Sequence, residues 1–233
     1  MVTQHQVNQL NGKLKNYKQR YLRKQYQALD ESGTRLMVNY FLTEVLGYTE
    51  LDEIKTEYQI RGEYADYVIQ LQRKKHFVVE VKSIEIDLTD KHLRQSLSYA
   101  ANEGVDWILL FNGRQVQLYK VNFGKPVTTK LIYAVDLMSP DDFKKSASQL
   151  VYLTKQSVAR GELDDYWRRF NALAPENLCK LVYSEEVAKL VRKELKSLTG
   201  IYFQIDDVAD SLYEVISKQV EFGRPKLRPA SKK

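Results

Sequence analysis

Asp66, Glu80 and Lys82 have the residue types and the spacing of a site that could cleave phosphodiester bonds. Glu80 and Lys82 are two positions apart in a predicted strand, so both side chains point to the same face of the sheet. Val79 and Val81 point to the other face, where they can join the core. Burying charged groups on an apolar sheet costs free energy unless they pair or bind a metal ion. We therefore expect the three charged side chains to form a site.

The chemistry of these three groups is that of a metal-assisted hydrolase. Two carboxylates on adjacent strands can hold Mg²⁺ through oxygen ligands, with water completing the octahedron. A metal ion at that place lowers the pKa of its water and neutralises charge on a phosphate. A lysine beside it can position or deprotonate the attacking water and can stabilise the pentavalent phosphate. The sequence thus predicts Mg²⁺ as the cofactor, with Mn²⁺ as an alternative.

The apolar pattern predicts the elements that position these groups. Helices are expected over 5–29, 31–46 and from Thr89 or Asp90 to about Asn102, and strands over 54–60, 64–71, 76–82, 107–111, 116–121 and 130–135. Arg61-Gly-Glu63 is a plausible hairpin connection, and Asn112-Gly113 is a strong tight-turn signal. This order of elements predicts an α/β sandwich with a mixed central sheet flanked by helices.

The second half of the chain reads as a C-terminal helical annex. A helix is expected to start at Ser184 and stop at Gly200, and another opens at Asp206 or Asp207. From Gly223 onward the sequence has two prolines and mostly basic residues, which predicts disorder. The predicted parts are an N-terminal helix (1–29), an α/β domain (30–137), the helical annex (138–222) and a basic tail (223–233).

Composition places the chain in the soluble globular class. Of its 233 residues, 43% are hydrophobic and 28% are charged, enough to bury a core. The longest uncharged apolar run, Trp107–Phe111, is far shorter than the roughly 20 residues of a membrane span. The N-terminus has no secretory signal pattern, and Cys179 is the single cysteine, so no intrachain disulfide can form. These features predict a cytoplasmic protein without a membrane partner.

The net charge of +6 is concentrated at the two ends of the chain. No acidic residue precedes Asp30, and none follows Glu221. Basic ends suit a polyanionic partner such as nucleic acid, although they can also serve only for solubility. The apolar face of the first helix could pair with a second copy or a partner subunit, but we favour packing on its own domain.

The order of motifs resembles a known nuclease superfamily. Asp66 followed by Glu80-Val-Lys82 looks like the PD-(D/E)xK motif of restriction-endonuclease-like nucleases, with Ala65 in place of the motif's proline. Gln95-x-x-x-Tyr99 looks like the QxxxY motif of some branches. The stretch also resembles the N-terminal nuclease domain of type I restriction enzyme R subunits in the following segments: Glu31-Ser-Gly-Thr-Arg35, Leu46-Gly-Tyr48, Asp66-Tyr-Val-Ile69 and Phe111-Asn-Gly113 through Leu118-Tyr119.

This resemblance, over about residues 30–137, implies the restriction-endonuclease-like fold and a role for each matched residue. Asp66 and Glu80 are implied as metal ligands and Lys82 as the catalytic lysine. Gln95 and Tyr99 are implied to contact the DNA backbone or to orient the site. Glu31 is implied as an auxiliary acid on the metal side, and Glu44 on the same helix is the competing choice.

The sequence therefore predicts a Mg²⁺-dependent deoxyribonuclease, with two alternatives left open. The chain could be a catalytically inactive nucleic-acid-binding module that kept the fold, or a helical adaptor that recruits another subunit. No G-x-x-x-x-G-K-[ST] phosphate loop is present, so the ATP-driven motor of a complete R subunit is missing from this chain. DNA or RNA, single or double strands, sequence preference and the biological pathway (restriction or phage defence, for example) stay open.

Overall fold

A six-stranded mixed sheet is the centre of residues 1–163, the first of the two compact units into which the chain divides. The computed structural model describes residues 1–60 and 63–217. The strands lie in the sheet in chain order: β1 (Ile54–Ile60), β2 (Glu63–Leu71), β3 (Lys74–Val81), β4 (Trp107–Phe111), β5 (Gln115–Asn122) and β6 (Thr128–Asp136). Each neighbouring pair is antiparallel except β3 and β4, which are parallel. The six predicted strands and the mixed sheet are confirmed; the turn predicted at 61–63 falls partly outside the described residues.

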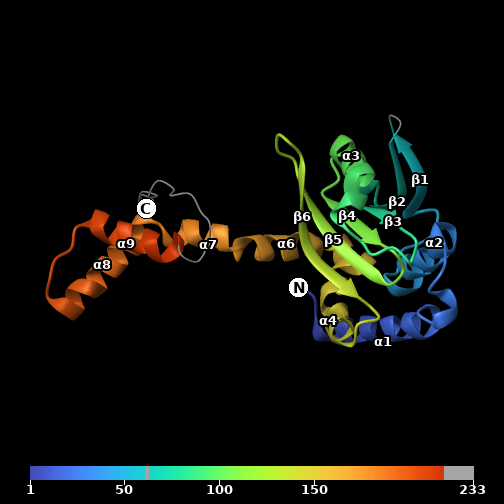
Figure 1. Ribbon diagram of the computed structural model, residues 1–233, viewed down its shortest axis with the longest axis horizontal. Helices are drawn as coiled ribbons and strands as arrows, with labels where there is room; N and C mark the ends of the chain where they lie inside the picture. Colours follow the sequence, from blue (N-terminus) through green and yellow to red (C-terminus); the bar gives the residue numbers. More distant parts are fainter. Residues whose placement is uncertain (61–62, 218–233) are drawn as a thin grey trace. The chain divides into compact units, whose positions relative to one another are not determined.

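The parallel pair requires a crossover connection, which is helical as the sequence predicts. It consists of the 3₁₀ turn η3 (Asp90–Leu93), capped by Thr89, and the helix α3 (Arg94–Glu103). One face of the sheet packs against α3 (Figure 1), and its core includes Val78, Ile108 and Tyr99. The crossover places the first turn of α3 beside the end of β3.

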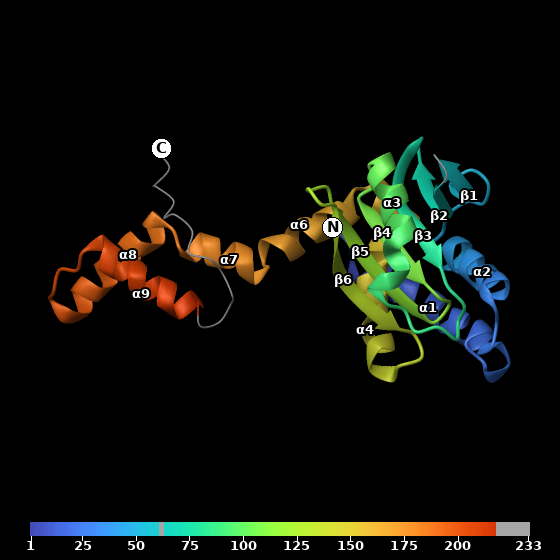
Figure 2. The same ribbon diagram turned by 45° about the horizontal axis from the view of Figure 1, so that its top comes forward.

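The opposite face of the sheet is covered by a second helical layer. Its inner members are α2 (Glu31–Tyr40) and the π-helical turn η2 (Phe41–Val45), which together confirm the helix predicted over 31–46. The Phe41 ring packs on Phe111 of β4 with centroids 4.7 Å apart. Figure 2 shows α3 in front of the sheet and α1 behind it. The sheet is therefore sandwiched between helices on both faces.

The N-terminal helix α1 (Gln4–Tyr21) packs on its own unit. Its face with Leu10, Leu14 and Tyr17 is buried, and the Lys18 amine donates to the Leu137 carbonyl oxygen at 2.8 Å. The prediction that this helix reaches residue 29 is wrong. The helix ends at Tyr21 because the chain becomes extended at Arg23 and folds back in the 3₁₀ turn η1 (Lys24–Tyr26), which brings the Tyr26 ring to 6.4 Å from that of Tyr21.

Three helical segments after β6 belong to the first unit. They are α4 (Pro140–Leu150), the 3₁₀ turn η4 (Val151–Leu153) and α5 (Lys155–Ala159). The helix α4 contacts both α1 and β6. The division between units falls after Leu163, so these segments, which the sequence assigns to the annex, lie in the unit that contains the sheet. The helix α6 (Glu162–Ala172) spans the division.

The second unit consists of helices in its described part. Besides the greater part of α6, these are α7 (Pro175–Val182), α8 (Glu185–Thr199) and α9 (Ile205–Ser217). Cys179 is buried with Tyr183, Ala209 and Ile216. The predicted ends of α8 are confirmed, because the Ser184 hydroxyl accepts from the Val187 amide and Gly200 adopts φ of 74°. The predicted basic tail, 223–233, lies outside the described residues.

Among the described residues, no helix has the length and apolar content needed to cross a membrane.

Tyr17 connects α1 to the turn that joins β4 and β5. The side chain is fully buried, and its hydroxyl donates to the Gly113 carbonyl oxygen at 2.6 Å. Gly113 adopts φ of 85°, as the predicted Asn112-Gly113 turn requires. Burial raises the pKa of Tyr17 well above its ordinary value of 10.0. The folded state therefore keeps a proton that the unfolded state releases above about pH 10.

We expect Tyr17→Phe to lower the free energy of unfolding at neutral pH by about 1–2 kcal/mol, because the Gly113 carbonyl loses its buried donor. Between pH 10 and 11 the wild type should lose stability as pH rises. The free energy of unfolding of the Phe variant should fall less steeply with pH. The slopes of the two proteins should differ by up to about 1.4 kcal/mol per pH unit, the value for one proton. Urea unfolding from pH 8 to 11 measures both effects. Equal slopes for the two proteins would show that Tyr17 ionises in the folded state as easily as in the unfolded state.

Candidate functional site

Three of the predicted residues, Asp66, Glu80 and Lys82, lie at the end of β3, where the first turns of α2 and α3 approach the sheet. Glu80 is the penultimate residue of β3 and Lys82 follows the strand. Only 3% of Glu80 is exposed, whereas Val79 and Val81 are fully buried on the opposite face. The alternation of a strand thus places the two charged side chains on one side, as the sequence predicts.

Lys82 and Glu80 are in direct contact. The Lys82 ammonium donates to Glu80 Oε1 at 2.6 Å, and 21% of the lysine side chain is exposed. The other Glu80 oxygen, Oε2, accepts a hydrogen bond from the Ser96 hydroxyl in the first turn of α3. Both Glu80 oxygens therefore have donors, one a charged group that reaches the surface and one a buried hydroxyl.

Asp66 lies on the neighbouring strand. The antiparallel register ends where Tyr67 pairs with Val79, so Asp66 and Glu80 are the next residues along their two strands. Asp66 Oδ2 accepts from the Val81 amide at 2.7 Å. Its other oxygen, Oδ1, accepts from the Arg35 guanidinium at 2.5 Å. The carboxylate is thereby fixed by β3 on one side and by α2 on the other.

Burial controls the ionisation of Glu80. Removal from water raises the pKa of this carboxyl above its ordinary value, and the negative charge of Asp66 adds to the increase. The hydrogen bonds and the positive charge of Lys82, together with the Ser96 hydroxyl, act in the opposite direction without cancelling the effect of burial. An additional positive charge near Glu80 would therefore favour the ionised form of this carboxyl group.

Asp66, Glu80, Lys82 and Arg35 form a charged cluster at the end of β3, and Glu31 lies at its rim. Its Oε1 is 3.2 Å from the Arg35 guanidinium, and its Oε2 is 3.9 Å from the Lys82 nitrogen. Glu44, the competing choice, is exposed on η2. Of the two candidates for an auxiliary acid, Glu31 is the one that contacts the other charged groups.

Gln95 and Tyr99 occupy different environments on α3. Gln95 is exposed and directly precedes Ser96, the residue that contacts Glu80. Tyr99 is fully buried between α3 and the sheet, and its hydroxyl accepts from the Lys75 amine at 3.3 Å. Gln95 is therefore next to a cluster residue in sequence. The Tyr99 side chain instead contacts Lys75, which forms an ion pair with Glu103.

Arg35 and Ser96 belong to the cluster, although the sequence pattern assigned neither of them a role. Arg35 stands four residues after Glu31 on α2, a spacing at which opposite charges pair, so a search for such pairs could have found it. Ser96 carries no such signal, because a serine inside a helix is common. Only its place on α3 next to β3 reveals its contact with Glu80.

Hydrogen bonds behind the cluster hold α2 against the segment that follows β3. The Thr34 hydroxyl accepts from the Ile84 amide at 3.1 Å, and the Ser83 hydroxyl donates to the Leu29 carbonyl oxygen at 2.9 Å. The Asp30 side chain caps α2 by accepting from the Gly33 amide at 2.8 Å. These bonds fix the position from which Glu31 and Arg35 reach the end of β3.

Asp66 and Glu80 are the carboxylates of the cluster that could serve as donors to a metal ion. Within residues 1–60 and 63–217, no group of three or more His, Cys, Asp and Glu side chains lies in an arrangement that could hold a metal ion. Asp66 and Glu80 are nevertheless hard oxygen donors on adjacent strands. Mg²⁺ commonly takes only one or two carboxylates from a protein and completes its octahedron with water and phosphate oxygens. The residues present thus fit a hydrated divalent cation.

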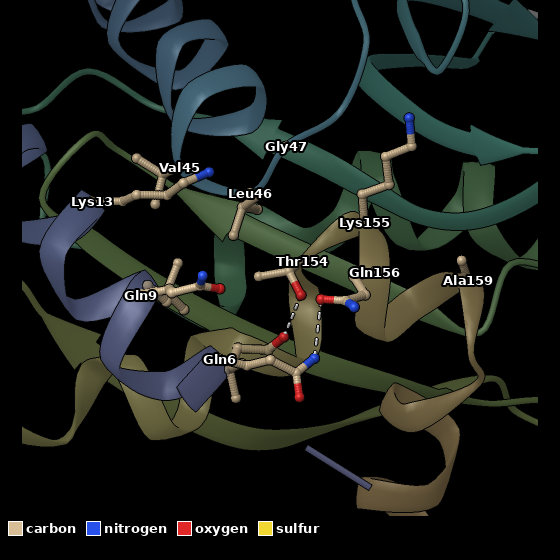
Figure 3. A pocket seen from close by; sticks show the side chains of 12 residues that line it. Gln6, Gln9, Lys13, Val45, Leu46, Gly47, Thr154, Lys155, Gln156 and Ala159 are labelled. Carbon is tan, nitrogen blue, oxygen red and sulfur yellow. Dashed lines mark hydrogen bonds between the residues drawn. The ribbon is translucent and has the colours of Figure 1, made fainter. Parts of the chain in front are cut away.

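Two pockets in the first unit differ in their relation to the cluster. One, of about 260 Å³, is lined by Arg35 of the cluster, together with residues of α2, β1 and β2. The other, of about 400 Å³, lies between α1 and α5, where the Gln6 amide donates to the Gln156 side chain at 3.1 Å (Figure 3). None of the charged cluster residues lines this second pocket. Of these two pockets, the first shares Arg35 with the cluster, and neither is lined by Asp66, Glu80 or Lys82.

The comparisons with known proteins bear on this segment of the chain. Residues 30–133 match the model of the family described as type I restriction enzyme R protein N terminus. The resemblance stated from the sequence is thereby confirmed for these residues, which contain the whole charged cluster. Comparisons with curated proteins and with solved structures found no match.

Proposed function

We propose, on the premise that residues 30–133 are similar to the N-terminal segment of type I restriction enzyme R proteins, that this chain is a metal-dependent nuclease that cleaves DNA. The observation that carries the proposal is the contact between Lys82 and Glu80, with Asp66 on the facing strand. Two carboxylates and an ammonium group at one strand end are the groups that phosphodiester hydrolysis requires.

Asp66 and Glu80 are the residues that would hold Mg²⁺ or Mn²⁺. Such an ion supplies positive charge to the phosphate and lowers the pKa of a water molecule that it binds. The Lys82 ammonium lies 2.6 Å from Glu80 and is partly exposed, so it can contact both a phosphate oxygen and the attacking water. Ser96 keeps the Glu80 carboxylate in place through its hydrogen bond.

Arg35 supplies a second cation to the same place. Its guanidinium contacts Asp66 and Glu31, and about a third of the side chain is exposed. A guanidinium group binds phosphate oxygens in a forked geometry, so Arg35 can exchange a carboxylate contact for one with the DNA backbone. In this proposal Lys82 and Arg35 hold the phosphate, and the two carboxylates hold the ion.

The experiment that tests the proposal is incubation with DNA under controlled metal conditions. The full chain is mixed with supercoiled plasmid or linear DNA in Mg²⁺, in Mn²⁺ or in EDTA, and products are separated by electrophoresis. We expect cleavage in either metal ion and none in EDTA. Intact DNA under all conditions, or cleavage that EDTA does not affect, would contradict the proposal.

The ion pair of Asp66 with Arg35 favours a second candidate, a nucleic-acid-binding module without catalysis. In the structure each of the two carboxylates already has a cationic partner, Arg35 for Asp66 and Lys82 for Glu80. A cluster balanced in this way needs no metal ion for stability. This candidate predicts DNA binding that weakens with salt and no cleavage, so the same incubation combined with a binding assay separates the two.

A further inference from the structure

A basic surface begins at the end of α1 and continues into the turn η1. It consists of Arg20, Arg23 and Lys24, which are all exposed. No acidic residue precedes Asp30 in the sequence. In the part of the chain that the structure describes, no carboxylate pairs with any of the three cations. Exposed cations without acidic partners attract a polyanion.

Contacts with neighbouring groups hold the two arginines in place. The Arg20 guanidinium carbon lies 4.8 Å from the centre of the Tyr40 ring and 5.3 Å from that of Tyr21. Arg23 Nε donates to the Gln19 carbonyl oxygen at 2.6 Å. Stacking on a ring uses the face of a guanidinium group and leaves the N–H groups at its edge for an anion. The arginines are thus positioned and still have donors.

The rings beneath Arg20 pack on one another. The centroids of Tyr21 and Tyr40 are 4.9 Å apart, and those of Tyr17 and Tyr26 lie 5.4 and 6.4 Å from that of Tyr21. Binding of unpaired bases requires aromatic faces on which the bases can stack. Because these rings already contact one another and Arg20, the cations are the groups that can meet a ligand. Cations of this kind bind phosphates, whether or not the bases are paired.

Hydrogen bonds tie the segment that carries the basic surface to the end of the sheet where the charged cluster lies. Before the surface, the Tyr17 hydroxyl donates to the Gly113 carbonyl oxygen in the turn after β4. After it, the Leu29 carbonyl oxygen accepts from the hydroxyl of Ser83, the residue next to Lys82. Since β3 and β4 are parallel neighbours, both contacts are at the edge of the sheet at which β3 ends.

The number of residues between these contacts limits the distance from the basic surface to the cluster. Lys24 is five residues before Leu29, so their Cα atoms are at most about 18 Å apart. Duplex DNA carries one phosphate charge per roughly 1.7 Å of its axis, so about ten charges occupy that length. A duplex with one phosphate at the charged cluster can therefore place other phosphates at the basic surface.

We propose that Arg20, Arg23 and Lys24 bind the phosphate backbone of duplex DNA beside the phosphate that is cleaved. The inference rests on the proposed function for the place of that phosphate. It adds a substrate-binding surface that precedes the matched residues 30–133. Phosphate contacts fix the position of a duplex and carry no sequence information, so the surface should bind duplexes of unrelated sequence equally.

The test measures binding of a fluorescent duplex to the full chain in EDTA at increasing salt concentrations. Arg23→Gln/Lys24→Gln removes two of the three charges. The slope of log K against log salt should become shallower by about 1.8, because each phosphate contact contributes about 0.9. Affinity at about 0.1 M salt should fall at least about tenfold. Arg20→Gln should change the slope by about 0.9.

A matched control is available where β3 begins, at the opposite end of the strand from the cluster. Arg73 and Lys74 have the same two residue types in the same order, and both are exposed. Arg73→Gln/Lys74→Gln therefore removes the same net charge and should keep the wild-type slope. A second duplex of unrelated sequence should give the same results. Circular dichroism verifies that each variant is folded.

The outcomes separate this inference from the proposed function. If the wild type cleaves DNA and Arg23→Gln/Lys24→Gln keeps its slope and affinity, the surface inference is overturned and the nuclease proposal stands. Equal losses in the two double variants also overturn the inference, because net charge alone would explain them. So does a loss for a single strand without one for the duplex. If no DNA is cleaved in Mg²⁺ or Mn²⁺ but only Arg23→Gln/Lys24→Gln loses duplex affinity, the nuclease proposal fails and the surface stands. Neither binding nor cleavage by the wild type overturns both.

Discussion

Lys82→Ala is expected to reduce DNA cleavage by about 10²–10⁴-fold, the contribution typical of a group that transfers protons or stabilises charge at a reacting centre. Lys82 is the one residue in this cluster that contacts the buried Glu80 carboxylate with an ammonium group and is also exposed to an incoming phosphate. Without Lys82, the positive charge at the phosphate is reduced, and Glu80 loses one of its two side-chain donors.

The same change should have a smaller effect on stability. Glu80 is almost fully buried, so loss of the Lys82 contact favours its protonated form and should lower the free energy of unfolding by about 1–3 kcal/mol at neutral pH. Circular dichroism and thermal unfolding verify that the variant is folded before cleavage rates are compared. The matched control is Lys120→Ala, which removes another lysine of the sheet, paired with Asp106 at 3.0 Å.

The control variant should melt at a lower temperature and still cleave DNA, because Lys120 pairs with Asp106 and lies over the Trp107 ring, outside the charged cluster. Cleavage by Lys82→Ala at the wild-type rate would remove the proposed mechanism. Equal losses in Lys82→Ala and Lys120→Ala would instead assign the effect of Lys82 to stability alone.

Asp66→Asn and Glu80→Gln are expected to abolish both cleavage and the response to metal ions. Each change keeps the size of the side chain and removes its negative charge. A hard divalent cation binds an amide oxygen much more weakly than a carboxylate, and Asp66 and Glu80, on the adjacent strands β2 and β3, are the metal ligands in our proposal. We expect cleavage to fall at least about 10³-fold in either variant.

Thermal unfolding with increasing Mn²⁺ measures metal binding separately from catalysis. A ligand that binds only the folded state at 100 times its Kd stabilises that state by about 2.7 kcal/mol. The wild type should show a rise in Tm of corresponding size, and the two variants should show little or none. Glu103→Gln is the control, because Glu103 is a partly buried carboxylate on α3 that pairs with Lys75 outside the cluster. The same Mn²⁺-induced rise in Asp66→Asn as in the wild type would exclude Asp66 as a ligand.

The elements that carry the site could be predicted from the sequence because local rules determine them. The period of two in a strand places Glu80 and Lys82 on one side and their valine neighbours on the other, whatever else surrounds them. The Asn112-Gly113 turn and the ends of α8 at Ser184 and Gly200 also follow from residues that favour particular backbone angles. Such rules act within a few residues, so a single sequence contains them.

The partners within the cluster depended on contacts between distant segments. Arg35 meets Asp66 across 31 positions, and it does so because Thr34 and Ser83 fix α2 against the segment after β3. No local pattern specifies which end of α2 reaches the sheet. Tyr99 illustrates the same point, since the spacing from Gln95 indicates a shared helix but only packing on the sheet turns its ring into the core.

What the sequence by itself determined is the set of strands, their order along the chain and the two charged side chains that share one face at the end of β3. The tertiary structure alone decided that Arg35 and Ser96 complete the cluster and that α4 and α5 belong to the unit with the sheet. The physical reason is the distance along the chain over which each kind of interaction acts. Backbone angles and side-chain alternation are fixed by neighbouring residues, whereas ion pairs and pockets arise only where packing brings separate segments of the chain together.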